Sequence, residues 1–193
     1  MRRTLAAFER CEEIDELILV AGDAVRDAVA EWTVAKLTAV VPGGAARHLS
    51  VWAGIEACAR QAEIIAVHDG ARPLIQPRQI SRCIAAARER GAVVCARPLT
   101  ETIKRADASG RLIESLDRTG VWIMETPQVF QRGLLVAAYQ KVLQDDREVT
   151  DETSALLHLG EEVFVIENHE PNPKVTFPSD LELAERNLAS LTP

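Results

Sequence analysis

The chain has 193 residues, of which 47% are hydrophobic and 26% charged, as in a typical soluble globular protein. Its net charge of −7 argues against a nucleic-acid-binding surface, and no apolar run approaches the roughly 20 residues that a membrane span needs. The four cysteines form no C-x-x-C pair, and the first residues show no signal-peptide core. We therefore expect free thiols in a cytoplasmic protein.

Short β-rich runs alternate with longer segments of helical periodicity. The predicted strands are residues 17–22, 37–41, 64–69, 92–98 and 163–168, and the predicted helices are 51–62, 80–91, 134–143 and 178–188. This alternation predicts an α/β sandwich with a mostly parallel sheet, because the strands are almost continuously apolar. Gly91 is expected to end its helix, and Ser50 and Ser179 are expected to cap theirs.

Residues 100–126 break this alternation. The stretch I-K-R-A-D-A-S-G-R-L-I reads as a hairpin with D-A-S-G as its turn. Several apolar side chains here would lack cover in a single chain: Ile103, Leu112, Ile113, Leu116, Val121 and Trp122. The segment is either a plain surface hairpin or an arm that packs on a second subunit, and the apolar content favours the arm. We expect one domain over residues 1–193, with the arm at about 100–126.

The junction V-H-D-G-A-R-P, residues 67–73, places polar side chains at the carboxyl end of a strand, where ligands bind in such folds. Asp69 can hold Mg²⁺ or sugar hydroxyls, or it can cap the following turn. Arg72 suits a phosphate contact but also a plain ion pair. His68 points away from Asp69 in a strand, which favours a structural role for the imidazole.

Other stretches carry candidate ligand-binding residues. In G-G-A-A-R-H-L-S, Gly43 and Gly44 allow close approach of a ligand, although such a pair is also an ordinary turn. The series Thr150-Asp151-Glu152 fits a helix N-cap as well as it fits function. Lys174 alone would be read as a solvated lysine. A local set of cations suits a small anionic ligand: Arg72, Lys104, Arg105, Arg118 and Lys174.

Taken together, the motifs resemble one family. V-H-D-G-A-R-P, E-T-I-K-R-A, T-P-Q-V-F, T-D-E-T-S-A-L and K-V-T-F-P-S-D-L occur in the order and spacing of 2-C-methyl-D-erythritol 4-phosphate cytidylyltransferases. The resemblance runs from about Thr4 to Leu188. It implies a Rossmann-like nucleotidyltransferase sandwich with a protruding β-arm. It also implies Mg²⁺-dependent transfer of CMP from CTP to 2-C-methyl-D-erythritol 4-phosphate in non-mevalonate isoprenoid biosynthesis, by a homodimer joined through the arm.

The same resemblance implies roles for individual residues. The CTP-binding residues would be Gly43, Gly44, Ser50, Asp69 and Gly70, with Asp69 also at the metal. The sugar-phosphate pocket would be formed by Arg72, Thr102, Arg118, Thr126, Thr150 and Lys174. Lys174 and Asp69 would be catalytic. The attacking phosphate oxygen is already ionised at neutral pH, so positioning and charge stabilisation suffice and no Ser-His-Asp set is needed.

The chain departs from the family pattern at two places. The family's first strand and its glycine-rich loop, A-x-G-x-G-x-R-M, have no counterpart, which predicts open apolar strand edges and fewer phosphate contacts. We expect an N-terminally truncated enzyme rather than a degenerate relative. Before Lys174 the sequence is P-N-P-K where the family has D-N-x-K, so metal binding by a carboxylate of this loop is not expected. The alternatives are a cytidylyltransferase for another polyol phosphate, such as ribitol 5-phosphate, and an inactive dimeric relative.

Overall fold

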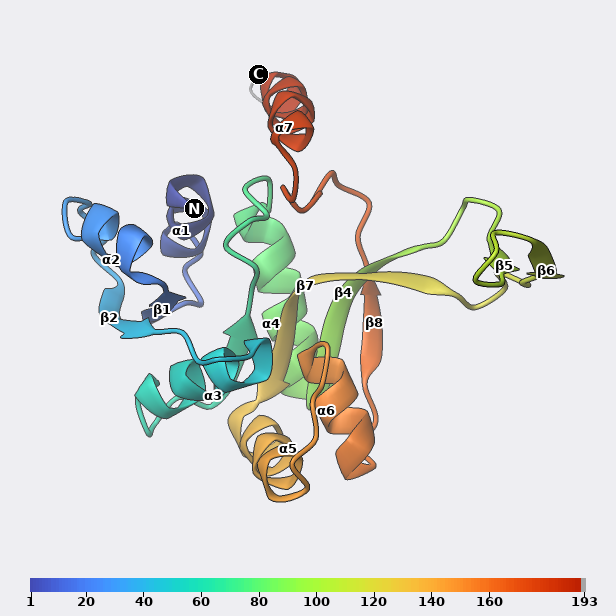
Figure 1. The fold of residues 1–193 in the computed structure, drawn as a ribbon. Helices are drawn as coiled ribbons and strands as arrows, with labels where there is room; N and C mark the ends of the chain where they lie inside the picture. Colours follow the sequence, from blue (N-terminus) through green and yellow to red (C-terminus); the bar gives the residue numbers. More distant parts are fainter. Residues whose placement is uncertain (192–193) are drawn as a thin grey trace.

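The computed structural model describes residues 1–191, and Figure 1 shows a central sheet with helices around it and one arm projecting far to the side. The amino-terminal elements are α1 (Arg2–Glu9), β1 (Leu17–Ala21), α2 (Asp23–Val29), β2 (Leu37–Pro42), α3 (Arg47–Ala57), β3 (Ile64–Val67) and α4 (Pro77–Arg90). They are followed by β4 (Ala92–Pro98), β5 (Lys104–Ala106), β6 (Leu112–Ser115), β7 (Trp122–Gln131), α5 (Arg132–Gln144), α6 (Glu152–Leu159), β8 (Phe164–Glu167) and α7 (Pro178–Leu191).

The central sheet has four strands in the order β3–β7–β4–β8. β7 runs antiparallel to β3 and β4, and β4 pairs in parallel with β8. Three of the four strands therefore point the same way, and β1 and β2 form a separate parallel pair. The predicted α/β class is confirmed, and all five predicted strands are present. β7 is an addition that the sequence pattern did not predict.

Two apolar clusters cover the two faces of this sheet. On one face, α1 and α4 pack with the side chains of Val93 and Val129. On the other face, α3, α5 and α6 pack with Ala92 and Phe130. Adjacent residues of one strand thus enter opposite clusters, because successive side chains of a strand alternate between its faces. This double burial explains the nearly continuous apolar runs in the sequence.

The sheet is interrupted between β1 and β3. β1 pairs with β2, and β3 pairs with β7. β1 and β3 are not paired with each other, and both line one cleft of about 920 Å³. Met1 and residues of α1 and α3, among them Phe8 and Val51, supply further walls of this cleft. The expected open apolar strand edges are therefore present in the described part of the chain, with α1 lying over them.

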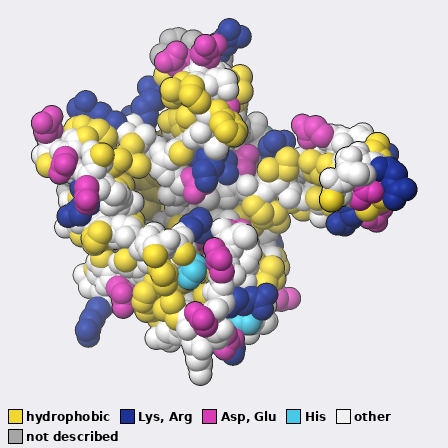
Figure 2. All heavy atoms as spheres, viewed as in Figure 1, with side chains coloured by type: hydrophobic (Ala, Val, Ile, Leu, Met, Phe, Trp, Pro, Cys, Tyr) yellow, Lys and Arg dark blue, Asp and Glu magenta, His cyan; other side chains and the backbone are white. Residues whose placement is uncertain are grey.

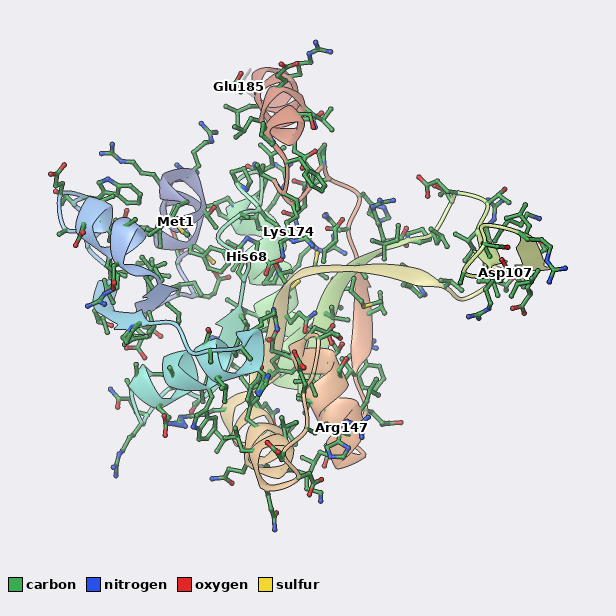
Figure 3. All side chains as sticks on the ribbon, viewed as in Figure 1. Met1, His68, Asp107, Arg147, Lys174 and Glu185 are labelled. Atoms are coloured by element: carbon green, nitrogen blue, oxygen red, sulfur yellow. The ribbon has the colours of Figure 1, made fainter. Side chains whose placement is uncertain are left out.

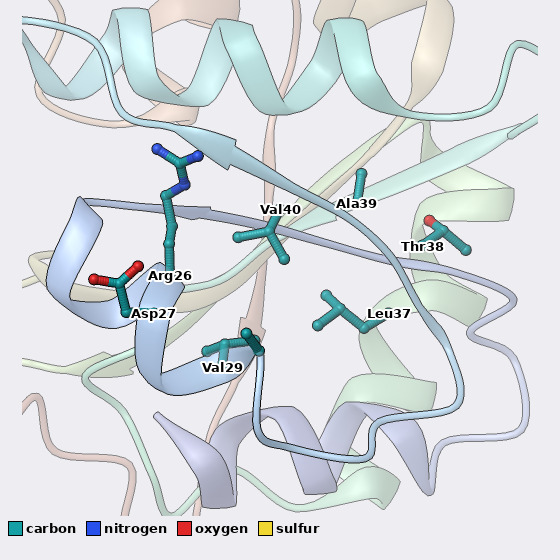
Figure 4. Close-up of a pocket in the computed structure, with 8 residues that line it drawn as sticks. Arg26, Asp27, Val29, Leu37, Thr38, Ala39 and Val40 are labelled. Atoms are coloured by element: carbon teal, nitrogen blue, oxygen red, sulfur yellow. The ribbon is translucent and has the colours of Figure 1, made fainter.

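A smaller pocket of about 400 Å³ lies between α2 and β2 (Figure 4). Its walls are Arg26, Asp27, Val29 and Ala30 of the helical segment and residues 37–40 of the strand. None of the residues predicted to bind ligand lines it, so the larger cleft is the one that bears on function.

The predicted arm leaves the body between the end of β4 and the start of β7 (Figure 1). β5 and β6 form its antiparallel hairpin, and the side chain of Asp107 organises the turn through bonds from the Ser109 and Arg111 amides. Leu112 and Ile113 of β6 are 67% and 53% exposed. Figure 2 shows hydrophobic side chains on the surface of the arm and of α7.

The structure corrects two predicted helix caps. α3 begins at Arg47, so Ser50 lies inside its first turns, where the hydroxyl donates to the Ala46 carbonyl in the manner of a helical serine. α7 begins at Pro178, and the carboxylate of Asp180, rather than Ser179, accepts the amide hydrogen bonds of the preceding turn.

Other predicted termini are confirmed. Gly91, with φ of 83°, ends α4, and the Asp151 side chain caps α6 by accepting from the Ser154 amide. All four cysteines are free thiols. Within residues 1–191, no helix combines the length and the apolar character needed to cross a bilayer.

Candidate active site

Three predicted site residues meet just beyond the carboxyl end of β3. Asp69 Oδ2 accepts a hydrogen bond from Arg72 Nε at 3.2 Å and lies 3.3 Å from Lys174 Nζ. The Asp69 and Arg72 side chains are 17% and 12% exposed, whereas Lys174 is 48% exposed. Lys174 comes from the loop between β8 and α7, so two segments about one hundred residues apart converge here.

The electrostatics of this cluster keep Asp69 ionised. Burial raises the pKa of the carboxyl, but the Lys174 and Arg72 cations outweigh it and hold the pKa below its usual value. Both cations contact Oδ2 of the carboxylate. The cluster therefore carries two cations for one carboxylate.

Thr126 joins the cluster from β7. Its hydroxyl oxygen accepts from the Asp69 amide at 3.1 Å and lies 2.9 Å from His68 Nδ1. The β4–β7 register shifts here: Val94 pairs with Gln128, but Ala96 pairs with Met124. Residues 125–127 therefore bulge out of the ladder, as bulges beside active sites commonly do, and Pro127 sits where no ladder donor is required.

His68 supports this site structurally. Its Nε2 lies 3.3 Å from the Arg72 carbonyl oxygen, and its ring packs on Phe8. Burial lowers the pKa of the imidazole to about 4, so the ring is neutral at pH 7. A neutral ring that accepts from Thr126 at Nδ1 and donates from Nε2 satisfies both contacts, in keeping with the structural role predicted for His68.

The glycine pair lies across the cleft from this cluster. The Gly44 amide donates to Ser50 Oγ at 2.9 Å, which folds the turn back onto α3. A Cβ atom at Gly44 would lie 2.6 Å from Leu49 Cβ, so a larger residue would force the backbone apart. Of the five residues predicted to bind CTP, four line the 920 Å³ cleft: Gly43, Ser50, Asp69 and Gly70.

Arg47, which the sequence reasoning did not single out, also lines this cleft. It forms a two-pronged ion pair with the fully buried Glu152, at 2.7 and 3.1 Å, and Tyr139 donates to the same carboxylate at 3.1 Å. Burial disfavours the charged guanidinium, but Glu152 more than compensates and raises the pKa of Arg47. This ion pair connects the start of α3 to the start of α6. In the sequence, the only indication of it was the arginine in G-G-A-A-R.

The remaining predicted residues do not join the cluster within this chain. Thr102 and Arg118 lie on the exposed arm, where Arg118 donates to the Thr100 carbonyl. Thr150 is exposed beside the start of α6, and its hydroxyl contacts Ser154. In Figure 3, His68 and Lys174 lie at the centre of the molecule, and Asp107 marks the distant arm.

The sequence reasoning also missed the network under the cluster. Glu125, Asn168 and Asn172 are buried, and both asparagine amides donate to Glu125 Oε2. Glu170, in the same loop, pairs with Arg78 on α4. In the described residues, no group of three or more His, Cys, Asp or Glu side chains is arranged to hold a metal ion.

An α/β sandwich whose strands end at a cluster of two cations and one carboxylate is typical of the class of nucleotidyltransferases. The family model for 2-C-methyl-D-erythritol 4-phosphate cytidylyltransferase matches residues 1–190, and the chain belongs to this family. The curated enzyme of that name from Symbiobacterium thermophilum is 37% identical over 183 residues, covering 95% of this chain and 78% of the relative. The one from Syntrophus aciditrophicus is 36% identical, covering 94% of this chain and 80% of the relative.

Solved structures agree with the sequence relatives. The crystal structure of 4-diphosphocytidyl-2C-methyl-D-erythritol synthase from Anaerococcus prevotii superposes with a TM-score of 0.84 at 30% identity, covering 97% of this chain and 84% of that chain. The 2-C-methyl-D-erythritol 4-phosphate cytidylyltransferase from Thermus thermophilus gives 0.83 at 28% identity, covering 98% and 88%. The Rossmann-like nucleotidyltransferase fold is thus shared across the described chain.

Proposed function

We propose that this chain transfers CMP from CTP to 2-C-methyl-D-erythritol 4-phosphate and releases pyrophosphate, a step of non-mevalonate isoprenoid biosynthesis. The observation that carries the proposal is the convergence of Asp69, Arg72 and Lys174 beside the cleft. Two cations around one carboxylate suit a site for several phosphate groups. The family membership of the chain selects cytidylyl transfer among the reactions that such a site could support.

The two substrates would approach the cluster from different sides. The cytosine and ribose of CTP would lie along Gly43, Gly44 and Ser50, with the triphosphate near Gly70 and Asp69. The methylerythritol phosphate would be held by Arg72, Thr126 and Thr150, with Lys174 between the substrates. Thr102 and Arg118 would complete the acceptor pocket from the arm of a second subunit, since they lie away from the cluster in their own chain.

A homodimer is supported by the surface of the arm. Leu112 and Ile113 are more than half exposed, and Val121 is 37% exposed. Burying such side chains against a second copy would remove the apolar area from water. The same contact would deliver Arg118, a cation suited to phosphate or sugar oxygens.

The reaction needs little acid–base chemistry. A phosphate oxygen of methylerythritol phosphate is ionised at neutral pH and attacks the α-phosphorus of CTP, with pyrophosphate leaving from the opposite side. Arg72 and Lys174 would hold the reacting groups in line and stabilise the negative charge. His68 is neutral and already engaged at both nitrogens, so it is not the base.

Mg²⁺ fits this site. Magnesium commonly binds one or two carboxylates together with substrate phosphates and water, rather than a cage of protein ligands. Asp69 is a mostly buried, ionised carboxylate that lines the cleft, so it would be the protein ligand. When bound, the ion supplies charge neutralisation on the phosphates.

The test is pyrophosphate release from CTP and Mg²⁺, with and without methylerythritol phosphate, and with ribitol 5-phosphate as the competing acceptor. We expect release that depends on methylerythritol phosphate and a much lower rate with ribitol 5-phosphate. Preference for ribitol 5-phosphate would reassign the acceptor. Dimer formation without turnover of either acceptor would favour an inactive relative, for which the open cleft between β1 and β3 is the structural argument.

A further inference from the structure

Glu125 is a buried carboxylate that the proposed chemistry does not use. It lies in the bulge of β7 and is 5% exposed. Its Oε2 accepts from Asn168 Nδ2 at 2.8 Å and from Asn172 Nδ2 at 3.1 Å, while Arg97 Nε lies 3.7 Å from Oε1. The Cys95 thiol also donates to Oε2, at 3.9 Å. A buried charge is costly unless it is paired and hydrogen-bonded, so these four partners stabilise the carboxylate here.

Two of these partners belong to the loop that carries Lys174. Pro171 and Pro173 flank Asn172 and have no amide hydrogen to donate. Between the backbone hydrogen bonds of Asn168 and Val175, side chains supply further anchors: Asn168 and Asn172 both donate to one oxygen of Glu125. Removing that oxygen would take one of two acceptors from each side-chain amide, leaving Asn168 with the Glu170 carbonyl and Asn172 with the Thr126 carbonyl.

The network also reaches the other side of the active site. Asn172 Nδ2 donates to the Thr126 carbonyl at 2.8 Å, and the Asn172 carbonyl accepts from Arg72 Nη1 at 2.8 Å. Just after Lys174, the Val175 amide donates to the Ala71 carbonyl at 2.8 Å. The segments that carry Arg72, Thr126 and Lys174 are thus tied together through Asn172, which Glu125 holds.

We infer that Glu125 is a positioning residue: it fixes the 168–175 loop so that Lys174 and Arg72 face the reacting phosphates. The inference rests on the proposed function and adds a residue to it. The interaction is indirect, because the Glu125 carboxylate points to Asn168, Asn172 and Arg97 rather than into the cleft. A misplacement of about 1 Å in a reacting group costs on the order of 10²-fold in rate, so a loosened loop would lower kcat.

The experiment compares Glu125→Ala and Glu125→Gln with the control Val142→Ala. Val142 is fully buried in the cluster on the other side of the sheet, so its truncation destabilises the fold without touching the loop. Readouts are kcat, the KM for CTP, and hydrogen–deuterium exchange of residues 168–175, all measured well below each variant's Tm.

We expect Glu125→Ala to lower kcat by about 10- to 100-fold, with a KM for CTP within about threefold of the original, because the cytidine side of the cleft is untouched. Exchange in residues 168–175 should accelerate. Glu125→Gln keeps one acceptor oxygen for both asparagine amides. Its kcat and the slow hydrogen exchange of residues 168–175 should therefore stay close to those of the original chain. Val142→Ala should change neither kcat nor the exchange of this loop.

Two results would overturn the inference. One is a Glu125→Ala protein whose loop exchanges no faster than in Val142→Ala, and the other is faster exchange with unchanged kcat. If the original chain shows no turnover, the proposed function fails on its own, and unchanged loop exchange would still overturn the anchoring by Glu125.

Discussion

The cluster of Asp69, Arg72 and Lys174 and the arm differ in burial and in the sequence distance between interacting residues. Asp69 and Arg72 are mostly buried, and their partners come from segments about one hundred residues away, including Asn172 and Lys174. On the arm, the Asp107 carboxylate accepts its hydrogen bonds from Ser109 and Arg111, so all of them are exposed and lie within four residues of it. The cluster is therefore organised within one chain, whereas the arm exposes apolar side chains that the proposed second subunit would cover.

This contrast explains how one site can use both regions. Cations that stabilise charge in a transition state work best when they are fixed before the reaction, which the buried cluster allows. Residues that recognise the acceptor can arrive with another subunit. The predictions that follow run from the largest expected effect to the smallest.

Removing the more exposed cation of the cluster, Lys174, should have the largest effect. Lys174→Ala is expected to lower kcat by about 10²- to 10³-fold, the usual loss for one well-placed donor. The matched control is Lys141→Ala, because Lys141 pairs with Asp145 on the outside of α5. Equal activities of the two variants in a pyrophosphate-release assay would remove Lys174 from the chemistry.

Protonation of His68 should destabilise the folded protein. Burial lowers its pKa from 6.5 to about 4, so as the pH falls the unfolded state binds the proton first. The neutral imidazole of His68 therefore makes its full contribution to the free energy of unfolding above pH 6.5. As the pH falls from 6.5 towards 4, the free energy of unfolding should decrease by roughly 3 kcal/mol. Urea denaturation across this range should show the loss in the original chain and in His169→Asn, whose imidazole is exposed, but not in His68→Asn. If the free energy of unfolding of His68→Asn still falls between pH 6.5 and 4, the loss belongs to other titrating groups.

Charging the arm should weaken the dimer without unfolding the chain. The double variant Leu112→Asp and Ile113→Asp is expected to raise the dimer Kd by about 30-fold or more, as expected at the centre of an interface. Leu157→Asp is the control, because Leu157 is 64% exposed on α6, away from the arm. The measurement is sedimentation velocity. A monomeric original chain, or the same dimer Kd for the arm variant and for Leu157→Asp, would contradict the proposed homodimer.

The smallest effect is expected at the arm turn. Asp107→Ala removes several hydrogen bonds, but all are exposed, and such contacts contribute little to stability. The Tm should shift by less than about 2 °C. A larger loss by calorimetry would mean that the arm turn, like the cluster, supports the body of the protein.

The sequence predicted those parts of the fold whose signal is local. Five strands were apparent as apolar β-rich runs, and Gly91 and Asp151 were apparent as helix ends. β7 was not predicted, because Glu125, Thr126 and Gln128 are polar and Pro127 argues against a strand. The bulge resolves the conflict by removing residues 125–127 from the ladder, while Gln128 stays paired, and it brings Thr126 to the site.

The site divides in the same way. Asp69 and Arg72 were apparent from V-H-D-G-A-R because they follow an apolar strand. The Glu125 network joins residues 43 and 47 positions apart, and no local pattern predicts such a pairing. The prediction that Ser50 caps α3 was wrong, because α3 begins at Arg47. The Ser50 hydroxyl instead accepts from the Gly44 amide, which lies outside the helix.

The most direct test of the account is a ³¹P NMR spectrum of this chain incubated with CTP, methylerythritol phosphate and Mg²⁺. The account predicts pyrophosphate together with a new phosphoanhydride that joins CMP to methylerythritol phosphate, and neither product from the Lys174→Ala protein on the same timescale. Unchanged substrate signals with the folded original chain, or equal product from both proteins, would contradict it.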